Sequence, residues 1–331
     1  MKTIRWGILG CGKIARKFAA DIKLVKNAEL IAIAAREQST ADAFAKDFPV
    51  KYKHSGYKAL AENAEVDAIY IATPHALHHE HALLCLNNNK AVLCEKAFAI
   101  NHSQAKDMVD FAQKKKIFLM EAFWTKFLPH YQLMKEMIAD GKVGKIQNVI
   151  ANFGFIPTPP VAPRLYDPKL GGGSLLDIGV YPVLLAVDLL GRPDDVAAVM
   201  TPSDQGTDSQ CAIQLNYKNG TLAQLFCTFT SSLSAGADIG GDQGRIRFTH
   251  RFHGPTTNLE YYPGIVDTRE EIFFEKAQGF GYEYEIQHVT DCLMNGLTES
   301  PTMKHADTLL LMDTLDRIRE KASIHYPADD H

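Results

Sequence analysis

The chain has 331 residues, of which 46% are apolar, and a formal net charge of −4 at pH 7. This length and composition suit a soluble globular protein with two domains. Acidic and basic residues are interleaved without long blocks of one sign, which argues against a nucleic-acid partner. Small diffusible partners are therefore expected.

The amino terminus and the cysteines suggest a cytoplasmic protein without a membrane partner. The first residues, MKTIRWGILGCG, lack the apolar core and cleavage site of a signal peptide, and no run approaches the ~18 uncharged apolar residues of a membrane helix. The six cysteines form no C-x-x-C pair. Neither a zinc site nor a disulfide framework is expected.

The first part of the chain alternates β-rich runs with helical patterns, which predicts βαβ units and a parallel sheet. Asn101 or Ser103 is the expected cap of the last helix in this part. The expected strands are 4–9, 30–34, 68–72, 91–94 and 117–121, and the expected helices are 13–22, 41–48, 79–87 and 103–115.

The pattern changes after residue 124. Strand-like runs joined by tight turns such as Asn219-Gly220 predict a largely antiparallel sheet. The expected strands are 146–155, 196–200, 210–217, 221–231, 245–248 and 270–274, and the expected helices are 130–140, 174–190, 282–295 and 305–321.

The predicted fold class is therefore α/β. A doubly wound Rossmann domain is expected over residues 1–122, and a C-terminal α+β domain with a large, mostly antiparallel open sheet over residues 123–331. The final helix can pack back on the Rossmann domain.

The stretch GILGCGKIA places Gly10-x-Gly12-x-x-Ala15 directly between a predicted strand and a predicted helix. Glycine permits the tight reversal and lets backbone amides approach a pyrophosphate at the positive end of the helix. This placement predicts dinucleotide binding. The expected cofactor contacts in the turn are Gly10, Gly12, Lys13 and Ile14.

The second strand ends in Arg36, which has the planar charged donors that suit a 2′-phosphate. This favours NADP, with Ser39 as a further donor. Two alternatives stay open, because Glu37 can reach the ribose of NAD and Arg36 can be a solvated strand end.

Ligands of open parallel sheets bind beyond the carboxyl ends of the strands. The residues at those ends form a rim where a nicotinamide would lie, and Lys96 is therefore a functional candidate. The expected cofactor contacts on this rim are Thr73, Pro74, His75, Glu95 and Lys96.

A second motif, GGGSLLDIGVYPV, contains Asp177 and Tyr181. Four residues apart on a helix, they share one face and can address one substrate. A nearby lysine cation would lower the pKa of the tyrosine from ~10 and fit it for proton exchange. Taken alone, such a pair is more often a surface group and a core edge.

Three residues are candidates for the substrate pocket: Trp124, Phe155 and Arg164. Aromatic residues in such segments are often core residues, and an arginine in a Pro-rich loop is often solvated. The histidines at 75, 78, 79 and 81 match no zinc motif, so no metal is expected. His75 is interpreted as lining the nicotinamide pocket and the others as part of the following helix.

Together these segments resemble the Gfo/Idh/MocA oxidoreductase family and look most similar to its dimeric dihydrodiol dehydrogenase branch. The motifs occur in the same order over nearly the whole chain, and they are GILGCGKIA, DAIYIATPHALHHEHALLCL, VLCEKAFA, LMEAFWTKFLP, GGGSLLDIGVYP, GFGYEYEIQHV and DTLDRIR. The resemblance implies hydride transfer between NAD(P) and a diol, polyol or sugar-like substrate. It also implies an open sheet that forms the interface of a homodimer or homotetramer.

The same resemblance implies site roles. The lysine of the family's Glu-Lys-Pro motif falls on Lys96, and its aspartate and proton-transfer residue fall on Asp177 and Tyr181. This chain has Ala97 in place of the usual proline, so whether the Lys96–Ala97 bond is cis or trans stays open.

The resulting hypothesis has Tyr181 exchanging the hydroxyl proton, Lys96 binding the reacting oxygen and Asp177 orienting substrate or lysine. Which of Lys96 and Tyr181 carries the proton is left open. A keto-sugar reductase of the anhydrofructose type and a non-catalytic NADP-binding sensor are the alternatives.

Overall fold

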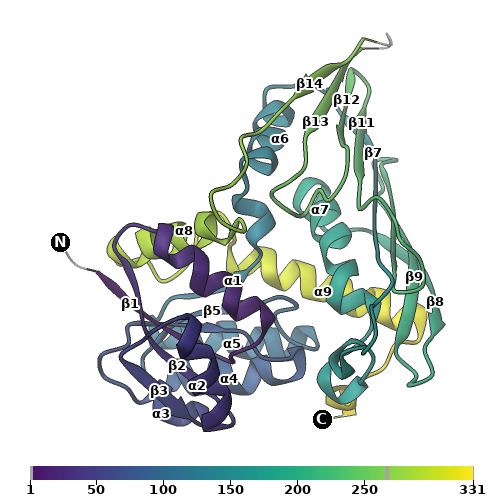
Figure 1. The fold of residues 1–331 in the computed structure, drawn as a ribbon. Coiled ribbons are helices and arrows are strands. Elements are labelled where there is room, and N and C mark those ends of the chain that lie inside the picture. The colour runs from purple at the N-terminus through teal and green to yellow at the C-terminus, as the bar shows by residue number, and fades with distance from the viewer. Residues whose placement is uncertain (1–2, 265–267, 331) are drawn as a thin grey trace. The chain divides into compact units, whose positions relative to one another are not determined.

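The computed structural model describes residues 3–264 and 268–330. The chain forms two compact units (Figure 1). The first unit takes in the chain up to Phe127 together with Gln278–Leu309, and the second takes in Leu128–Ala277 together with the chain from Leu310 onward.

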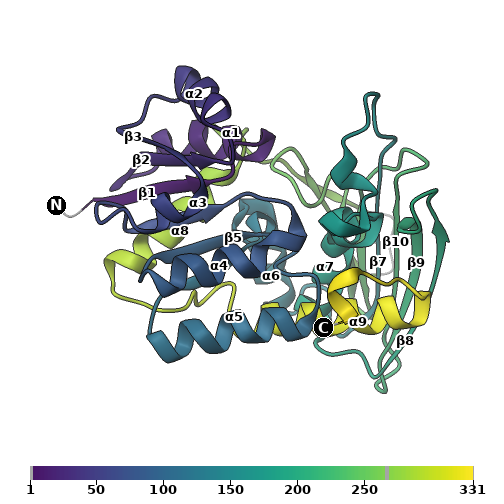
Figure 2. The same ribbon diagram turned by 90° about the horizontal axis from the view of Figure 1, so that it is seen from below.

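The first unit contains a six-stranded parallel sheet in the order β3-β2-β1-β4-β5-β6. Its central strands are near-continuous apolar runs because both faces are covered. Helices α4 and α5 lie side by side along this sheet (Figure 2). The strands are β1 (Ile4–Leu9), β2 (Ala28–Ala35), β3 (Tyr52–Ser55), β4 (Ala68–Ile71), β5 (Ala91–Glu95) and β6 (Leu119–Ala122).

This strand order confirms the predicted Rossmann architecture. The five predicted strands are present, whereas β3 and the short helix α3 were not anticipated, because YKHS has neither an apolar run nor a clean alternation. The helices are α1 (Lys13–Asp21), α2 (Gln38–Asp47), α3 (Tyr57–Ala61), α4 (His78–Asn87) and α5 (His102–Lys115). Asn101 caps α5 by accepting from the Gln104 amide at 2.9 Å.

A late segment of the chain completes the first unit. Helix α8 (Tyr282–Met294) packs against α1. The buried carboxylate of Asp21, at the end of α1, accepts from the amides of Phe280 and Tyr282 at 2.8 to 2.9 Å. These bonds satisfy amides at the start of α8 that have no partner within the helix.

The second unit contains an eight-stranded sheet in the order β14-β13-β12-β11-β7-β10-β9-β8. Among the described strands of this sheet, β7 and β10 pair in parallel and the other neighbours are antiparallel, as predicted. The strands are β7 (Ile146–Gly154), β8 (Asp195–Pro202), β9 (Asp208–Asn216), β10 (Leu222–Thr228), β11 (Ala237–Gly241), β12 (Gly244–Phe248), β13 (Leu259–Pro263) and β14 (Glu270–Ile272).

Helix α7 (Val180–Leu190) packs on β7 and β10, whereas no described helix covers the opposite face of β7, β10 and β9 (Figure 2). Alternate residues along β9 are buried, as expected for a sheet with one covered face. The other helices are α6 (Pro129–Ala139) and α9 (His305–Ala322), the latter contributing residues to both units.

The segment of residues 168–190 is long and apolar enough to cross a membrane, which was not predicted from the sequence. The most apolar window has a mean hydropathy of 1.7, and 78% of it is buried inside the protein. A helix that is apolar on all sides suits the core of a large protein. The burial therefore identifies this stretch as a core helix.

Candidate active site

The turn after β1 has the backbone geometry of a phosphate-binding loop. Gly10 has a φ of +103°, and a Cβ there would lie 2.9 Å from the carbonyl oxygen of Ala72. Gly12 is the N-cap of α1, and a Cβ there would meet nothing within 4 Å. Open space in front of unpaired helix amides fits a dinucleotide pyrophosphate. Lys13 and Ile14 begin the helix at this point.

Arg36 directly follows β2, and its side chain is exposed. The cationic guanidinium lowers the pKa of Tyr57, although burial outweighs it and the net pKa of that phenol is raised. Glu37 is the N-cap of α2 and makes no capping bond with its side chain. Both candidates for recognising the adenosine ribose therefore lie at the end of β2.

Lys96 follows β5, beside the strand end that carries the Thr73-Pro74-His75 turn. The backbone amide of Lys96 donates to the Glu95 carboxylate at 3.3 Å, and the Tyr70 hydroxyl donates to the same carboxylate. The Lys96–Ala97 peptide bond is cis, which answers the question left open by the missing proline. The rim residues named from sequence therefore occupy two neighbouring strand ends.

His78 connects the two parts of this rim and was missed from sequence as a site residue. Its Nε2 lies 2.8 Å from the carbonyl oxygen of Thr73, and its Nδ1 lies 2.8 Å from that of Ala97. Burial lowers the pKa of His78 to about 4, although both carbonyls favour the protonated ring. The sequence contained no signal for these carbonyl partners, since both depend on the tertiary fold.

Buried carboxyl groups lie beneath the rim. Burial raises the pKa of Glu121 to about 8, and burial with the charge of Glu95 raises the pKa of Glu285 well above its usual range. Neither oxygen of Glu285 has a hydrogen-bond partner within the described part of the chain. Neutral carboxylic acids are therefore the expected form of Glu121 and Glu285 at neutral pH.

Trp124 lies in the first unit and stacks on Tyr282, with ring centroids 4.7 Å apart and planes at 17°. The position of its ring is therefore fixed by α8. Its indole nitrogen is buried, with no hydrogen-bond partner among the described residues.

The other four candidates, Phe155, Arg164, Asp177 and Tyr181, lie in the second unit. There Arg164 donates to Asp177 at 3.1 Å. Asp177 is on a π-helical turn, Leu175–Gly179, that runs directly into α7. Such turns are frequent at functional sites. A π-helical turn holds more residues than an α-helical one, so Asp177 and Tyr181 are not spaced as the prediction of a shared α-helical face assumed.

Tyr181 lies in an aromatic cluster of the second unit. Its ring centroid is 5.8 Å from that of Phe153 and 4.8 Å from that of His253. Phe155 joins the same cluster through Phe153, at 6.3 Å. The fold thus brings two sequence candidates, Tyr181 and Phe155, together through a residue that the motifs did not identify.

The part of the chain that the structure describes contains no group of three or more His, Cys, Asp or Glu residues able to hold a metal ion. All six cysteines are free thiols. The glycine turn and the lysine-bearing rim are those of a nicotinamide-dependent oxidoreductase.

Comparison with known proteins defines the family. Residues 4–123 match the model of an oxidoreductase family with an NAD-binding Rossmann fold, and residues 131–247 match the GFO/IDH/MocA C-terminal domain. The chain belongs to the Gfo/Idh/MocA oxidoreductase family. The expected nicotinamide-dependent enzyme is thereby confirmed.

The relatives span the full chain. It is 33% identical to trans-1,2-dihydrobenzene-1,2-diol dehydrogenase of Sus scrofa, covering 99% of both chains, and 32% identical to that of Bos taurus, covering 99% of this chain and all of the other. A 3-ketoreductase of Actinomadura kijaniata, solved with NADP and TDP-benzene, superposes with a TM-score of 0.87 at 28% identity, covering 97% and 98% of the two chains.

Proposed function

We propose that this protein transfers hydride between NADP and a diol, polyol or sugar-like alcohol, with the first unit binding the cofactor and the second binding the substrate. The observation that carries the proposal is the rim, where Lys96 is held through Glu95 and lies beside the Thr73 turn. The similarity to dihydrodiol dehydrogenases supports a diol as substrate, and that to an NADP-bound ketoreductase supports NADP.

The residues present fit the cofactor, since Gly12 leaves open space at the start of α1 and Gly10 occupies a position with no room for a Cβ. In the proposal, Gly10, Gly12, Lys13 and Ile14 hold the pyrophosphate, and Arg36 binds the 2′-phosphate. Thr73, Pro74, His75 and Glu95 line the nicotinamide. The nicotinamide supplies the hydride acceptor or donor.

The chain itself supplies the proton chemistry. Tyr181 takes the hydroxyl proton of the substrate during oxidation and returns it during reduction, while the Lys96 ammonium donates a hydrogen bond to the reacting oxygen. Asp177, paired with Arg164, orients the substrate. Trp124 and Phe155 supply apolar surface.

Turnover with a panel of substrates tests the proposal. Purified enzyme is mixed with NADP and trans-dihydrodiols, aldoses or inositols, and with NADPH and keto-sugars, while absorbance is followed at 340 nm. Oxidation of diols is expected. Cofactor binding without turnover of any class, unaffected by Lys96→Met, would leave a non-catalytic sensor as the remaining interpretation.

Reduction of keto-sugars is the second candidate, favoured by the similarity to the 3-ketoreductase. The two activities use the same groups in opposite directions. Initial rates at neutral pH in both directions distinguish them, because a keto-sugar reductase would show turnover with NADPH and none with diols.

We propose further that two copies associate through the uncovered face of the second sheet. Its exposed apolar side chains include Val199, which is 67% exposed, and Ile150, which is 47% exposed. Burying such a patch against a second copy removes apolar surface from water.

We also propose a cytoplasmic location, because the six free thiols suit a reducing setting.

Light scattering coupled to gel filtration tests the association. Val199→Asp introduces a charge into this face and is expected to shift the protein to monomer. Leu297→Asp, at a position 43% exposed in the first unit, is the matched control and is expected to leave the mass unchanged. A monomeric wild-type protein would contradict the proposal.

A further inference from the structure

The turn that precedes the Asp177–Tyr181 helix is built from three glycines, two of which have no room for a side chain. Gly171 and Gly173 have φ angles of +74° and +118°. A Cβ on Gly172 would lie 2.7 Å from the backbone of Tyr166, and one on Gly173 would lie 2.2 Å from Asp208. The turn therefore fits closely against its surroundings.

Asp208, the first residue of β9, fixes the helix side of this turn. Its Oδ2 accepts from the Ser174 hydroxyl at 2.7 Å and from the Leu175 amide at 2.6 Å. Asp208 and Ser174 are fully buried. Burial raises the pKa of Asp208 to about 6, although the Ser174 hydroxyl and the Leu175 amide favour the carboxylate. The helix start is thus held by a carboxylate from a distant strand.

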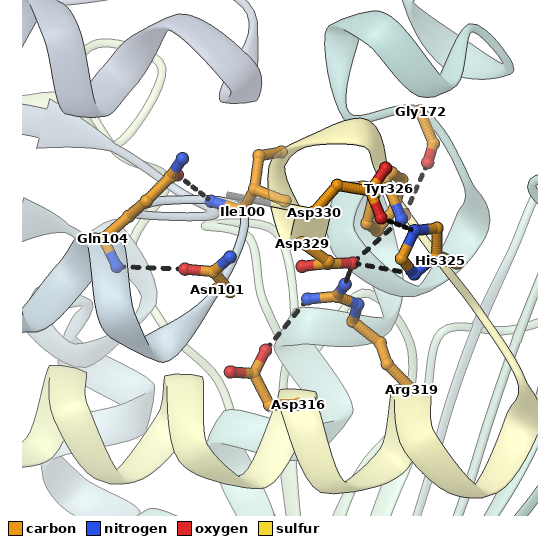
Figure 3. Close-up of polar contacts among 10 residues, drawn as sticks. All are labelled: Ile100, Asn101, Gln104, Gly172, Asp316, Arg319, His325, Tyr326, Asp329 and Asp330. Carbon is orange, nitrogen blue, oxygen red and sulfur yellow. Dashed lines mark hydrogen bonds and ion pairs between the residues drawn. The ribbon is translucent and has the colours of Figure 1, made fainter.

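Tyr326 fixes the other side of the turn. Its hydroxyl donates to the carbonyl oxygen of Gly172 at 2.7 Å, and the residue is 1% exposed (Figure 3). The Tyr326–Gly172 bond and the Asp208–Leu175 bond hold backbone groups on either side of Gly173. Gly173 itself has no side chain that could restrict the backbone. Tyr326 therefore contacts the turn from which the helix begins.

A buried arginine holds Tyr326 in place. The Arg319 guanidinium lies 4.8 Å from the centre of the Tyr326 ring and donates to Asp329 and Asp316 (Figure 3). Asp329 in turn accepts from the Tyr326 amide at 2.9 Å. A buried arginine that bonds two separate carboxylates through its planar guanidinium has a fixed position and supports the ring packed against it.

We propose that Tyr326 and Asp208 are positioning residues for the helix that carries Asp177 and Tyr181, because they clamp the Gly172–Leu175 turn from which that helix begins. The inference rests on the proposed function for the roles of those two residues. Displacements near 1 Å cost enzymes about 100-fold in rate. A clamp two to nine residues from the reacting groups is close enough to control such displacements.

The test compares two tyrosines with the same chemistry. Tyr261, also buried in the second unit, donates its hydroxyl to the Lys142 carbonyl at 2.9 Å, away from the glycine turn. Tyr326→Phe and Tyr261→Phe each remove one such bond. We expect kcat with the diol to fall roughly threefold to tenfold in Tyr326→Phe alone, with the affinity for NADPH unchanged in both variants.

Hydrogen–deuterium exchange of residues 174–181 measures the clamp without turnover. Tyr326→Phe is expected to speed exchange there by roughly two- to tenfold, and Tyr261→Phe to leave it unchanged. Asp208→Ala should act like Tyr326→Phe, and Asp208→Asn, which retains an acceptor oxygen, should restore much of the loss.

Equal losses of kcat in the two tyrosine variants, or unchanged exchange in Tyr326→Phe, would overturn the inference. An inactive wild-type enzyme whose exchange still responds to Tyr326→Phe would instead contradict the proposed function and leave the clamp supported.

Discussion

The two units hold their candidate residues in different ways. In the first unit, Gly10 and Lys96 directly follow β1 and β5, and Thr73 lies two residues beyond β4, so the sheet topology brings all three to one edge. In the second unit, the Asp177–Tyr181 helix begins on a turn held by Asp208, 33 residues from Leu175, and by Tyr326, 154 residues from Gly172.

This difference predicts which kind of change damages each unit. A rim positioned mainly by the backbone is expected to tolerate the loss of most side chains, except those that meet cofactor or substrate and His78, which connects its two parts. A helix held by side chains is sensitive to residues far from the chemistry. The following substitutions test that contrast.

The largest effect is expected from Lys96→Met. This substitution removes the ammonium group that, in the proposal, donates a hydrogen bond to the reacting oxygen. We expect kcat to fall roughly 10³-fold while NADPH still binds, since the glycine turn is untouched. Absorbance at 340 nm and NADPH fluorescence measure the two quantities. Lys114→Met, on the exposed side of α5, is the control and should retain full activity. A drop of less than tenfold would remove Lys96 from the mechanism.

Arg36→Ala is expected to act on cofactor choice alone. Loss of a charged donor to the 2′-phosphate should raise the KM for NADP roughly 10- to 100-fold and leave kcat and the KM for NAD nearly unchanged. Glu37→Ala tests the alternative, in which Glu37 binds the ribose of NAD. If Glu37→Ala raises the KM for NAD while Arg36→Ala has no effect on NADP, the enzyme is NAD-specific.

Glu121 supplies a pH test of the buried carboxyl groups beneath the rim. Its pKa is about 8 in the folded protein, because burial disfavours the charged form. This effect is larger than that of the hydrogen bonds from Thr308 and Phe98 and the charge of Lys126, which lower the pKa. Between its usual pKa and pH 8 the folded state keeps a proton that the unfolded state releases, so the free energy of unfolding falls as pH rises through this window.

Each pKa unit corresponds to about 1.4 kcal/mol, so a loss of a few kcal/mol is expected for the first unit. Urea unfolding at pH 5 to 8.5 measures it. Glu121→Gln should flatten this dependence, whereas Glu62→Gln, at an exposed ion pair with Lys58, should not. An unchanged slope in Glu121→Gln would show that other groups cause it.

The same contrast explains what could be predicted from sequence. The Rossmann strands other than β3, and the glycine turn, follow from local patterns, namely apolar runs and G-x-G-x-x-A, and the structure has them where they were expected. β11 and β13 were missed because their GG and YYP residues break the alternation.

The residues that support the candidate site were harder to foresee. His78 is recognisable only once Thr73 and Ala97 are known to flank it, and Asp208 and Tyr326 only once the turn at Gly172 is known to meet them. Their roles depend on contacts between distant segments, for which a single sequence carries no periodic signal.

The smallest effect is expected from Asn101→Ala, which removes a local support in the first unit. The Asn101 side chain accepts from the Gln104 amide at 2.9 Å, and the Gln104 side chain accepts from the Ile100 amide at 3.2 Å (Figure 3). Losing an N-cap costs about 1 kcal/mol. We expect thermal unfolding to shift down by a few degrees while kcat stays within about twofold of wild type.

Asn101→Ser retains a capping oxygen and should recover most of the stability. The comparison with Tyr326→Phe is then direct, because both variants lose about one hydrogen bond and only the one in the second unit is expected to slow turnover. If Asn101→Ala slows turnover as much as Tyr326→Phe does, the first unit also depends on side-chain supports, because a cap that lies five residues from Lys96 would then help to position that lysine.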